Sequence, residues 1–191
     1  MKGRLKGMAA LGVIAALGAT SAQAQSEGGN LITVGAGGGI AIPLGDFSDA
    51  TKTGWDATAV FQFKPATSPV GFQIDGTYQQ NKFDDAFVGF DKTRLFYGTA
   101  NIVFWLPVSS ETRIRPYILG GGGVYNAKSK LDSGASTDSE TKFGINAGAG
   151  FDLDFQSNVG VFLEGRFHNV FVEGSDTKFI PINLGVRFHT M

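Results

Sequence analysis

The sequence predicts an all-β fold, in which eight antiparallel strands follow one another as an up-and-down meander and close into a transmembrane β-barrel. Three observations lead to this prediction. Apolar and polar residues alternate with a period of two in eight segments, the connections between the segments alternate between long and short, and the composition is rich in Gly and Phe. Because successive side chains of a strand point to opposite faces, a period of two indicates strands with one apolar and one polar face.

The clearest alternation covers residues 142–155, where Phe, Ile, Ala and Leu alternate with Gly, Asn and Asp. Asp152 and Asp154 share one face of a strand there, whereas a helix would place them on different sides. Segments 54–64 and 70–80 repeat the pattern over about 11 residues, which is the length that a tilted strand needs to cross a bilayer.

The other predicted strands have noisier patterns. Their boundaries are 31–42, 93–106, 113–125, 159–170 and 179–188. The facing of 113–125 stays open, because Tyr117 and Leu119 share a face with Arg115. The alternation therefore predicts eight strands, although one of them has no assigned orientation.

The connections support the same architecture. The longer ones are 43–53, 81–92, 126–141 and 171–178, and they interleave with the shorter 65–69, 107–112 and 156–158. Outer-membrane barrels have short periplasmic turns and longer external loops. An even number of strands then predicts that both ends of the barrel domain lie on the periplasmic side.

Residues 1–24 predict a secretory signal peptide. A cationic start precedes the apolar run 8–19, and a small-x-small cleavage site follows at 22–24. The run is shorter than the roughly 20 residues of a membrane-spanning helix. A retained anchoring helix is the alternative. We expect export, removal of this segment and a mature barrel domain of residues 25–191.

The composition limits the classes of protein. The chain has 191 residues, of which 42% are hydrophobic and 17% charged, with 28 Gly, 17 Phe, two His and no Cys. This argues against a disulfide-stapled scaffold, and the lack of a basic block argues against a nucleic-acid partner. Because acidic residues are scattered and Cys is absent, we expect no metal site and no cofactor.

A soluble barrel or sandwich is the structural alternative, and a period of two does not exclude it. Two features argue against it. The polar faces consist of Gly, Thr, Asn, Gln and Asp rather than Lys and Glu, and aromatic residues lie near strand ends, as in the girdles at membrane interfaces. The predicted girdle residues are Trp55, Phe63, Tyr78, Phe96, Phe104, Trp105, Phe143, Phe155 and Phe188.

The inward polar residues predict a packed network, because eight strands enclose an interior that side chains can fill. The expected members are Asp75, Asn101, Arg115, Asn146, Asp152, Asp154, Glu164, Arg166 and Arg187. We expect Arg115, Asp152, Asp154 and Arg187 toward the periplasmic end and the others nearer the middle, where acids and bases at one depth can pair. A stabilising plug is preferred here to a gated ion path.

The chain resembles the small outer-membrane β-barrel domain family, which includes the transmembrane part of outer membrane protein A and opacity-type surface proteins. The strand 115–123, RPYILGGGG, and the last strand 180–188, IPINLGVRF, carry the resemblance together with the signal peptide and the alternating segments. The resemblance implies a place in the Gram-negative outer membrane and insertion by the outer-membrane assembly machinery. That machinery reads an aromatic residue at the end of the last strand. Phe188 takes this place, although residues 189–191 follow it.

The run Gly120–Gly123 is not a phosphate-binding loop, because no Gly-Lys-Ser/Thr follows it. We expect these glycines to let the narrow barrel wall curve. Some eight-stranded outer-membrane barrels modify lipid A, and His168 is the candidate base, expected at the barrel rim. The deacylases have Ser two residues after their His, where this chain has Val170, so we expect no catalytic residue and no enzyme.

The sequence favours a structural or surface-interaction role, in adhesion or envelope integrity. A narrow, low-conductance channel is the alternative. Phe83, Phe87 and Phe90 alternate with Asp in an external loop, where they either bind an extracellular or host ligand or pack on one another. The expected partners are outer-membrane lipid and lipopolysaccharide, and the expected form is a monomer.

Overall fold

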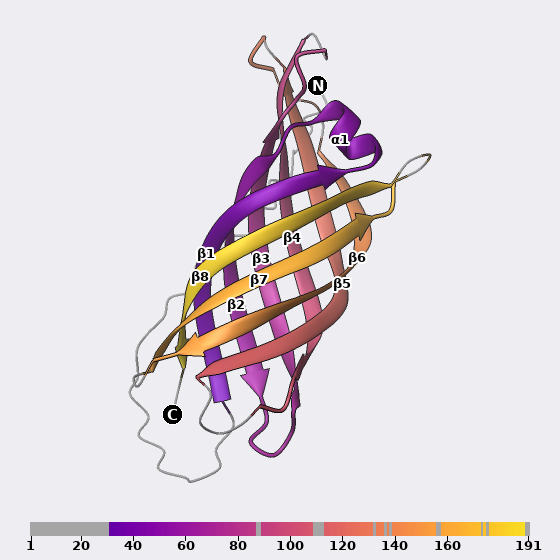
Figure 1. The fold of residues 1–191 in the computed structure, drawn as a ribbon. Helices are drawn as coiled ribbons and strands as arrows, with labels where there is room; N and C mark the ends of the chain where they lie inside the picture. Colours follow the sequence, from indigo (N-terminus) through magenta and orange to yellow (C-terminus); the bar gives the residue numbers. More distant parts are fainter. Residues whose placement is uncertain are drawn as a thin grey trace, which may run out of the picture.

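The chain forms one closed antiparallel sheet in which each strand pairs with its sequence neighbours and β8 pairs with β1 (Figure 1). This computed structural model describes residues 31–86, 89–108, 113–131, 133–135, 137, 139–155, 158–172, 174 and 176–189. The elements are β1 (Leu31–Leu44), α1 (Asp46–Ala50), β2 (Gly54–Lys64), β3 (Val70–Lys82), β4 (Phe90–Trp105), β5 (Ile114–Leu131), β6 (Glu140–Asp154), β7 (Val159–Val170) and β8 (Thr177–His189). The predicted eight-stranded meander barrel is confirmed. The predicted signal peptide lies outside the described residues.

The two ends of the barrel carry different connections. We call the end with α1 and the connections 45–53, 83–89, 132–139 and 171–176 the upper end, and the opposite end, with 65–69, 106–113 and 155–158, the lower end (Figure 1). Within the described ranges, no helix is long and apolar enough to cross a membrane.

The predicted long connection after the first strand contains the short helix α1. One expectation about the connections is wrong, because the strands β4, β5 and β6 extend beyond their predicted bounds at the upper end. As a result, the connection 106–113 spans as many residues as 132–139, and the alternation of long and short connections fails there. Polar residues pair in register beyond the apolar pattern, as Thr93 does with Ser129, because backbone groups pair whatever the side chains are.

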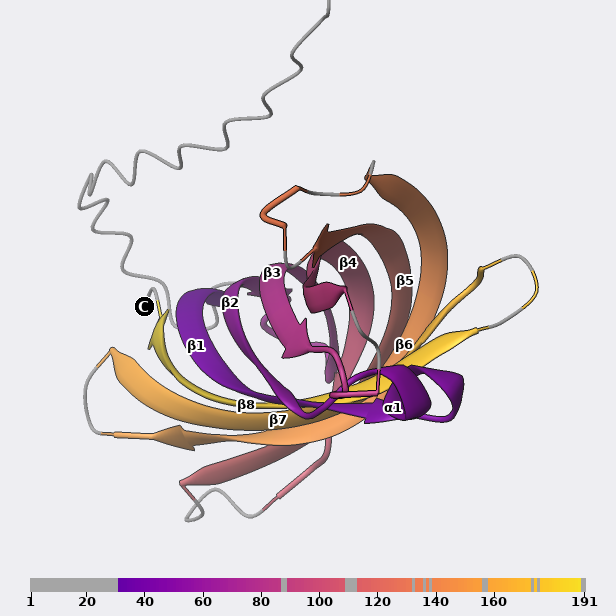
Figure 2. The same cartoon turned by 90° about the horizontal axis from the view of Figure 1, so that it is seen from above.

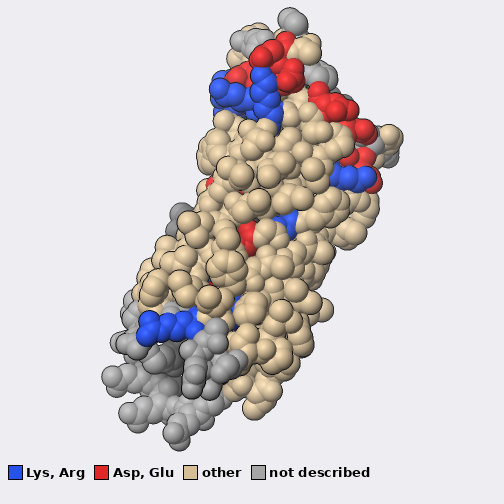
Figure 3. All heavy atoms as spheres, in the orientation of Figure 1, with Lys and Arg blue, Asp and Glu red and all other residues tan. Residues whose placement is uncertain are grey.

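Apolar side chains cover the outside of the barrel, and polar side chains fill much of its inside. Phe96 is 63% exposed and Phe143 is 73% exposed, whereas Gln73 and Gln79 are fully buried. Most of the visible wall between the two ends is uncharged (Figure 3). This arrangement is the reverse of a soluble barrel and suits a wall that contacts lipid.

The facing of β5 follows from burial. Tyr117, Leu119 and Tyr125 are buried, so the face that includes Arg115 points inward. Trp105 is only 6% exposed and also points inward, so its predicted place in an external aromatic girdle is wrong. The misassignment arose because the interior holds aromatic as well as polar side chains.

Glycines line the seam where β1 meets β8. Gly37 pairs with Gly185, and the Phe162 ring of β7 lies against both. A Cβ on Gly37 would lie 2.8 Å from Phe162 Cζ, which is closer than real Cβ contacts. The seam therefore needs glycine so that a large ring can fill the interior of a narrow barrel.

Candidate functional site

A line of five charged side chains, which we call the ion chain, runs through the barrel interior from its middle toward the lower end. In order of contact they are Asp75 on β3, Arg166 and Glu164 on β7, Arg187 on β8 and Asp152 on β6. All five are buried. Because alternate residues of a strand share a face, Glu164 and Arg166 point into the same space.

Each link of the ion chain is a short contact between opposite charges. The Arg166 guanidinium donates to both oxygens of Asp75, at 2.9 and 3.0 Å, and its Nε lies 3.0 Å from Glu164 Oε1. Glu164 Oε2 lies 3.6 Å from Arg187 Nη2, and Arg187 also donates to Asp152. Two guanidinium groups thus join three carboxylates across the interior.

Neutral polar groups donate further hydrogen bonds to two of these carboxylates. Thr99 and Asn101 on β4 donate to Asp75 at 2.9 and 3.0 Å. The Tyr117 hydroxyl donates to Glu164 Oε2 at 2.8 Å and accepts from Arg187 at 3.1 Å. Pairing and hydrogen bonding offset the cost of burying these charges. Arg187 Nε is the exception, since it has no hydrogen-bond partner among the described residues.

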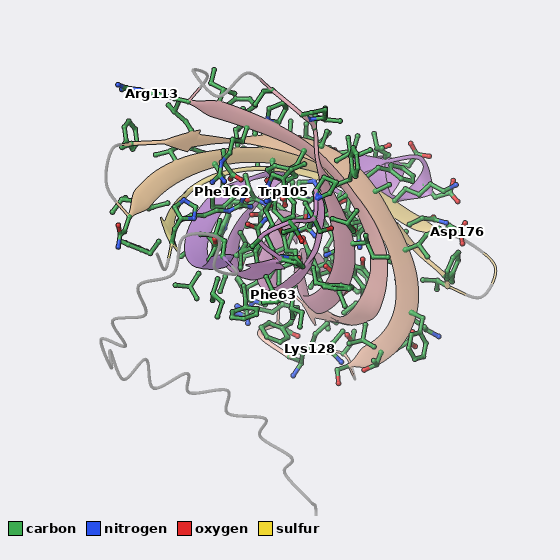
Figure 4. All side chains as sticks on the ribbon, turned by 90° about the horizontal axis from the view of Figure 1, so that it is seen from below. Phe63, Trp105, Arg113, Lys128, Phe162 and Asp176 are labelled. Atoms are coloured by element: carbon green, nitrogen blue, oxygen red, sulfur yellow. The ribbon has the colours of Figure 1, made fainter. Side chains whose placement is uncertain are left out.

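Two apolar layers enclose the ion chain. The upper layer comprises Leu95, Tyr97, Tyr125, Val170 and Phe179, and the lower layer comprises Val103, Trp105, Tyr117 and Leu119. In the view from below, Trp105 and Phe162 lie within the ring of strands, and Arg113 lies outside it (Figure 4). The view from above shows the same single interior enclosed by all eight strands (Figure 2). The interior therefore combines the predicted polar filling with apolar layers.

His168 belongs to the upper layer and not to the rim where it was expected. It is fully buried, its ring stacks on Phe179 at 4.9 Å, and its Nδ1 lies 2.8 Å from the Tyr125 hydroxyl. His168 lies two residues after Arg166 on β7, so its side chain points to the same inward face. There it packs against side chains of β5 and β8.

The other predicted network residues are not members of the ion chain, although Asn101 donates to its Asp75. Asn146 is buried on β6 next to His168 in the register. Arg115 is half-buried at the lower end, where it lines a cavity of about 340 Å³ with Lys64 and Trp105. The side chain of Asp154 lies outside the described residues.

Several interior residues were not among the predicted network. Gln62 donates to Gln73 at 2.7 Å, and Gln73 donates to Asp75 at 3.3 Å. Asp56 is a further buried acid on β2. The period-two pattern had already placed these three on polar faces, so the alternation along each strand was enough to predict that they point into the barrel. Tyr117 offered no such signal, because an inward aromatic residue looks like a lipid-facing one.

The upper loops place their aromatic residues against each other. The rings of Phe83 and Phe90 lie 5.2 Å apart, and Phe87 lies outside the described residues. In the same region the hydrogen bond of 2.8 Å and the charge of Lys52 hold the pKa of Asp85 below its ordinary value. This contact therefore ties the loop after β1 to the loop after β3.

Phe188 lies near the end of β8 with its side chain outward and 54% exposed. Within the described part of the chain, no group of three or more His, Cys, Asp or Glu could hold a metal ion. The chemistry that the interior does provide is mutual charge compensation between groups on different strands.

Comparison with known proteins gives a family and several structural neighbours. The profile of the family described as outer membrane protein beta-barrel domain matches residues 9–189. Neisserial surface protein A superposes with a TM-score of 0.60 at 16% identity, covering 86% of this chain and 99% of that one. Ail, the attachment invasion locus protein of Yersinia pestis, solved with the heparin analogue sucrose octasulfate, gives 0.59 at 17% identity, covering 85% and 99%.

A third structural neighbour is OprG from Pseudomonas aeruginosa, with a TM-score of 0.53 at 13% identity, covering 86% of this chain and 97% of that one. No curated protein matches the chain. At these identities the structural neighbours establish the barrel fold.

Proposed function

The chain belongs to the outer membrane protein beta-barrel domain family. From this membership we propose that it is a structural barrel with a closed interior, whose upper end faces the outside of the cell and makes surface interactions. The family implies a place in the outer membrane of Gram-negative bacteria. The proposed role is in adhesion or envelope integrity, without catalysis. The proposed form is a monomer, because every strand of the sheet already pairs with two neighbours.

The ion chain between two apolar layers is the observation that carries the closed interior. An ion that crossed the barrel would have to compete with Arg166 for Asp75 and Glu164, and both contacts are about 3 Å long. It would also have to pass the buried rings of Tyr97 and Tyr125 above and of Trp105 and Tyr117 below. Both obstacles support a plug that stabilises the wall.

Planar-bilayer recordings test this proposal. We expect the purified full chain to give no stable conductance steps, because the charges of the ion chain are paired and side chains fill so narrow a barrel. Arg166→Gln weakens the ion chain, and Arg113→Gln changes an exposed arginine at the lower end as the matched control.

Reproducible steps in the wild-type protein that change in size or ion selectivity in Arg166→Gln, but not in Arg113→Gln, would contradict the closed interior. They would favour the narrow channel instead. Steps that are identical in all three proteins would come from a path outside the ion chain and would also contradict the plug.

The upper end supports the surface-interaction part of the proposal. Its strands extend beyond the apolar wall, so polar side chains of β4, β5 and β6 stand clear of the region that faces lipid. Neisserial surface protein A and Ail are surface and attachment proteins by name. Their low identity limits that comparison to the fold, so the surface role depends on the upper end of this chain.

A further inference from the structure

Five cationic side chains share the outer face of three adjacent strands at the upper end. Paired residues of antiparallel strands lie on the same face. The register pairs Lys82 with Lys92, Lys92 with Lys130, and Arg94 with Lys128. This face points outward, because Phe96 follows Arg94 by two residues on β4 and is exposed. We call Lys82, Lys92, Arg94, Lys128 and Lys130 the cationic face.

One ion pair among the described residues involves this face. Among the described residues, no ion pair involves Lys82, Arg94, Lys128 or Lys130, and Lys92 contacts its sequence neighbour Asp91 at 3.4 Å. Lysine directly opposite lysine destabilises a sheet. Figure 3 shows Lys and Arg atoms gathered on one side of the upper end, with Asp and Glu atoms beside them. An anionic ligand would remove this repulsion.

The cationic face lies directly above the apolar wall. On the outward side of β4, Arg94 is followed by Phe96, Gly98, Ala100, Ile102 and Phe104. Eight residue steps from Phe96 to Phe104 cover about 27 Å along the strand at ~3.4 Å per residue. With the usual tilt of barrel strands, this corresponds to a height of about 20 Å, close to the ~25 Å apolar band of such barrels.

We propose that the cationic face binds the phosphate groups of lipopolysaccharide. The position selects a lipid over a soluble polyanion, because a ligand whose phosphates reach these residues sets its acyl chains against the exposed Phe96 and Val124 just below. The proposal rests on the outward orientation of the upper end given above. It assigns the surface interaction of this barrel to its side wall and not to its loop tips.

Titration of purified lipopolysaccharide into the full chain in detergent micelles tests the proposal. The test variant is Lys82→Gln/Lys128→Gln/Lys130→Gln. The matched control is Lys52→Gln/Lys142→Gln/Lys178→Gln, which removes three cations of the same end that already contact Asp85, Glu140 and Asp176. We expect Kd to rise at least about tenfold in the test variant and less than about twofold in the control.

Thermal unfolding of the same proteins gives a second readout, in which the three substitutions change stability differently without and with lipopolysaccharide. Without lipopolysaccharide, the test variant should be at least as stable as wild type, because repulsion between opposed lysines is reduced. With lipopolysaccharide, wild type should gain stability and the test variant should not. Dephosphorylated lipopolysaccharide should bind wild type as weakly as the intact form binds the test variant.

Three outcomes would overturn the proposal. Equal losses of affinity in the test and control variants would indicate unspecific attraction to the upper end. Undiminished binding of the dephosphorylated form would assign recognition to the acyl chains. Inorganic polyphosphate that competes at equal phosphate concentration would identify a soluble polyanion as the ligand. None of these outcomes depends on conductance, so the proposal of a closed interior is tested separately.

Discussion

Asp75 accepts hydrogen bonds from residues on three strands. Arg166 on β7 supplies two of them, Thr99 and Asn101 on β4 supply one each, and Gln73 adds one from β3 itself. All of these partners donate hydrogen bonds to residue 75, so its side chain must have acceptor atoms only. A carboxylate meets this requirement, and an amide does not.

Asp75→Asn should therefore lower the free energy of unfolding by about 2–4 kcal/mol, because the new amide N–H₂ faces donors and Arg166 loses part of its countercharge. Urea unfolding of the refolded barrel in detergent, followed by tryptophan fluorescence, measures the change. Asp91→Asn is the control at the rim, and we expect a change below about 0.5 kcal/mol there. Similar losses of unfolding free energy in both variants would contradict a special role for the buried Asp75.

For single residues, the alternation of faces along a strand was enough to place Asp75, Glu164 and Arg166 inside the barrel. It did not show which acid meets which base, because Asp75 and Arg166 are 91 residues apart and their height depends on strand tilt. The alternation also puts Trp105 on the face of Thr99 and Asn101; its place in the girdle was predicted from its aromatic side chain, and inward and lipid-facing aromatic residues look the same in a sequence. The partner of a buried charge thus depends on the whole sheet, which local patterns do not encode.

The seam between β1 and β8 depends on residues that lack side chains. A Cβ added to Gly185 would meet the Phe162 ring and the Ala36 carbonyl oxygen, whereas a Cβ added to Gly76 on β3 would meet nothing within 4 Å. The two glycines therefore have different roles, although both lie in strands of the same barrel.

Gly185→Ala should lower the free energy of unfolding by about 1–3 kcal/mol, because Phe162 and β1 must shift to make room. The measurement is the fraction of folded protein, which migrates differently from boiled protein on an SDS gel, across a urea series. Gly76→Ala is the matched control and should leave the midpoint unchanged or slightly higher. If Gly185→Ala behaved like Gly76→Ala, the seam would tolerate side chains and Phe162 would not need the glycines.

The strand bounds show where the sequence pattern stops being informative. The apolar alternation ends near Tyr125 on β5, yet the strand continues to Leu131. Above the wall neither face is apolar, so the residues from Asn126 onward read as a loop in the sequence while their backbone still pairs with β4. For the same reason, the cationic face emerged only from the register.

The whole molecule has to reach the membrane before any of its contacts matter. Phe188 is exposed on the outside of the last strand and belongs to neither apolar layer. The resemblance to small outer-membrane barrels implies that the assembly machinery reads an aromatic residue at this place.

Phe188→Ser should lower the amount of folded protein in the outer membrane of cells severalfold, while the purified variant refolds in detergent as wild type does. Phe167→Ser on β7 removes another outward Phe and should affect neither quantity strongly. Immunoblots of membrane fractions measure the first quantity, and heat-modifiable migration measures the second. Equal membrane levels of the two variants would leave Phe188 without a role in assembly.

The ion chain also has a consequence for the kinetics of folding. Its members come from β3, β6, β7 and β8, so Arg166 and Asp75 meet only after the two ends of the sheet have joined. Contacts between residues far apart in sequence form late, and interactions absent from the transition state slow unfolding without speeding folding. The paired charges of the interior therefore govern how long a folded barrel lasts and have little influence on how quickly it forms.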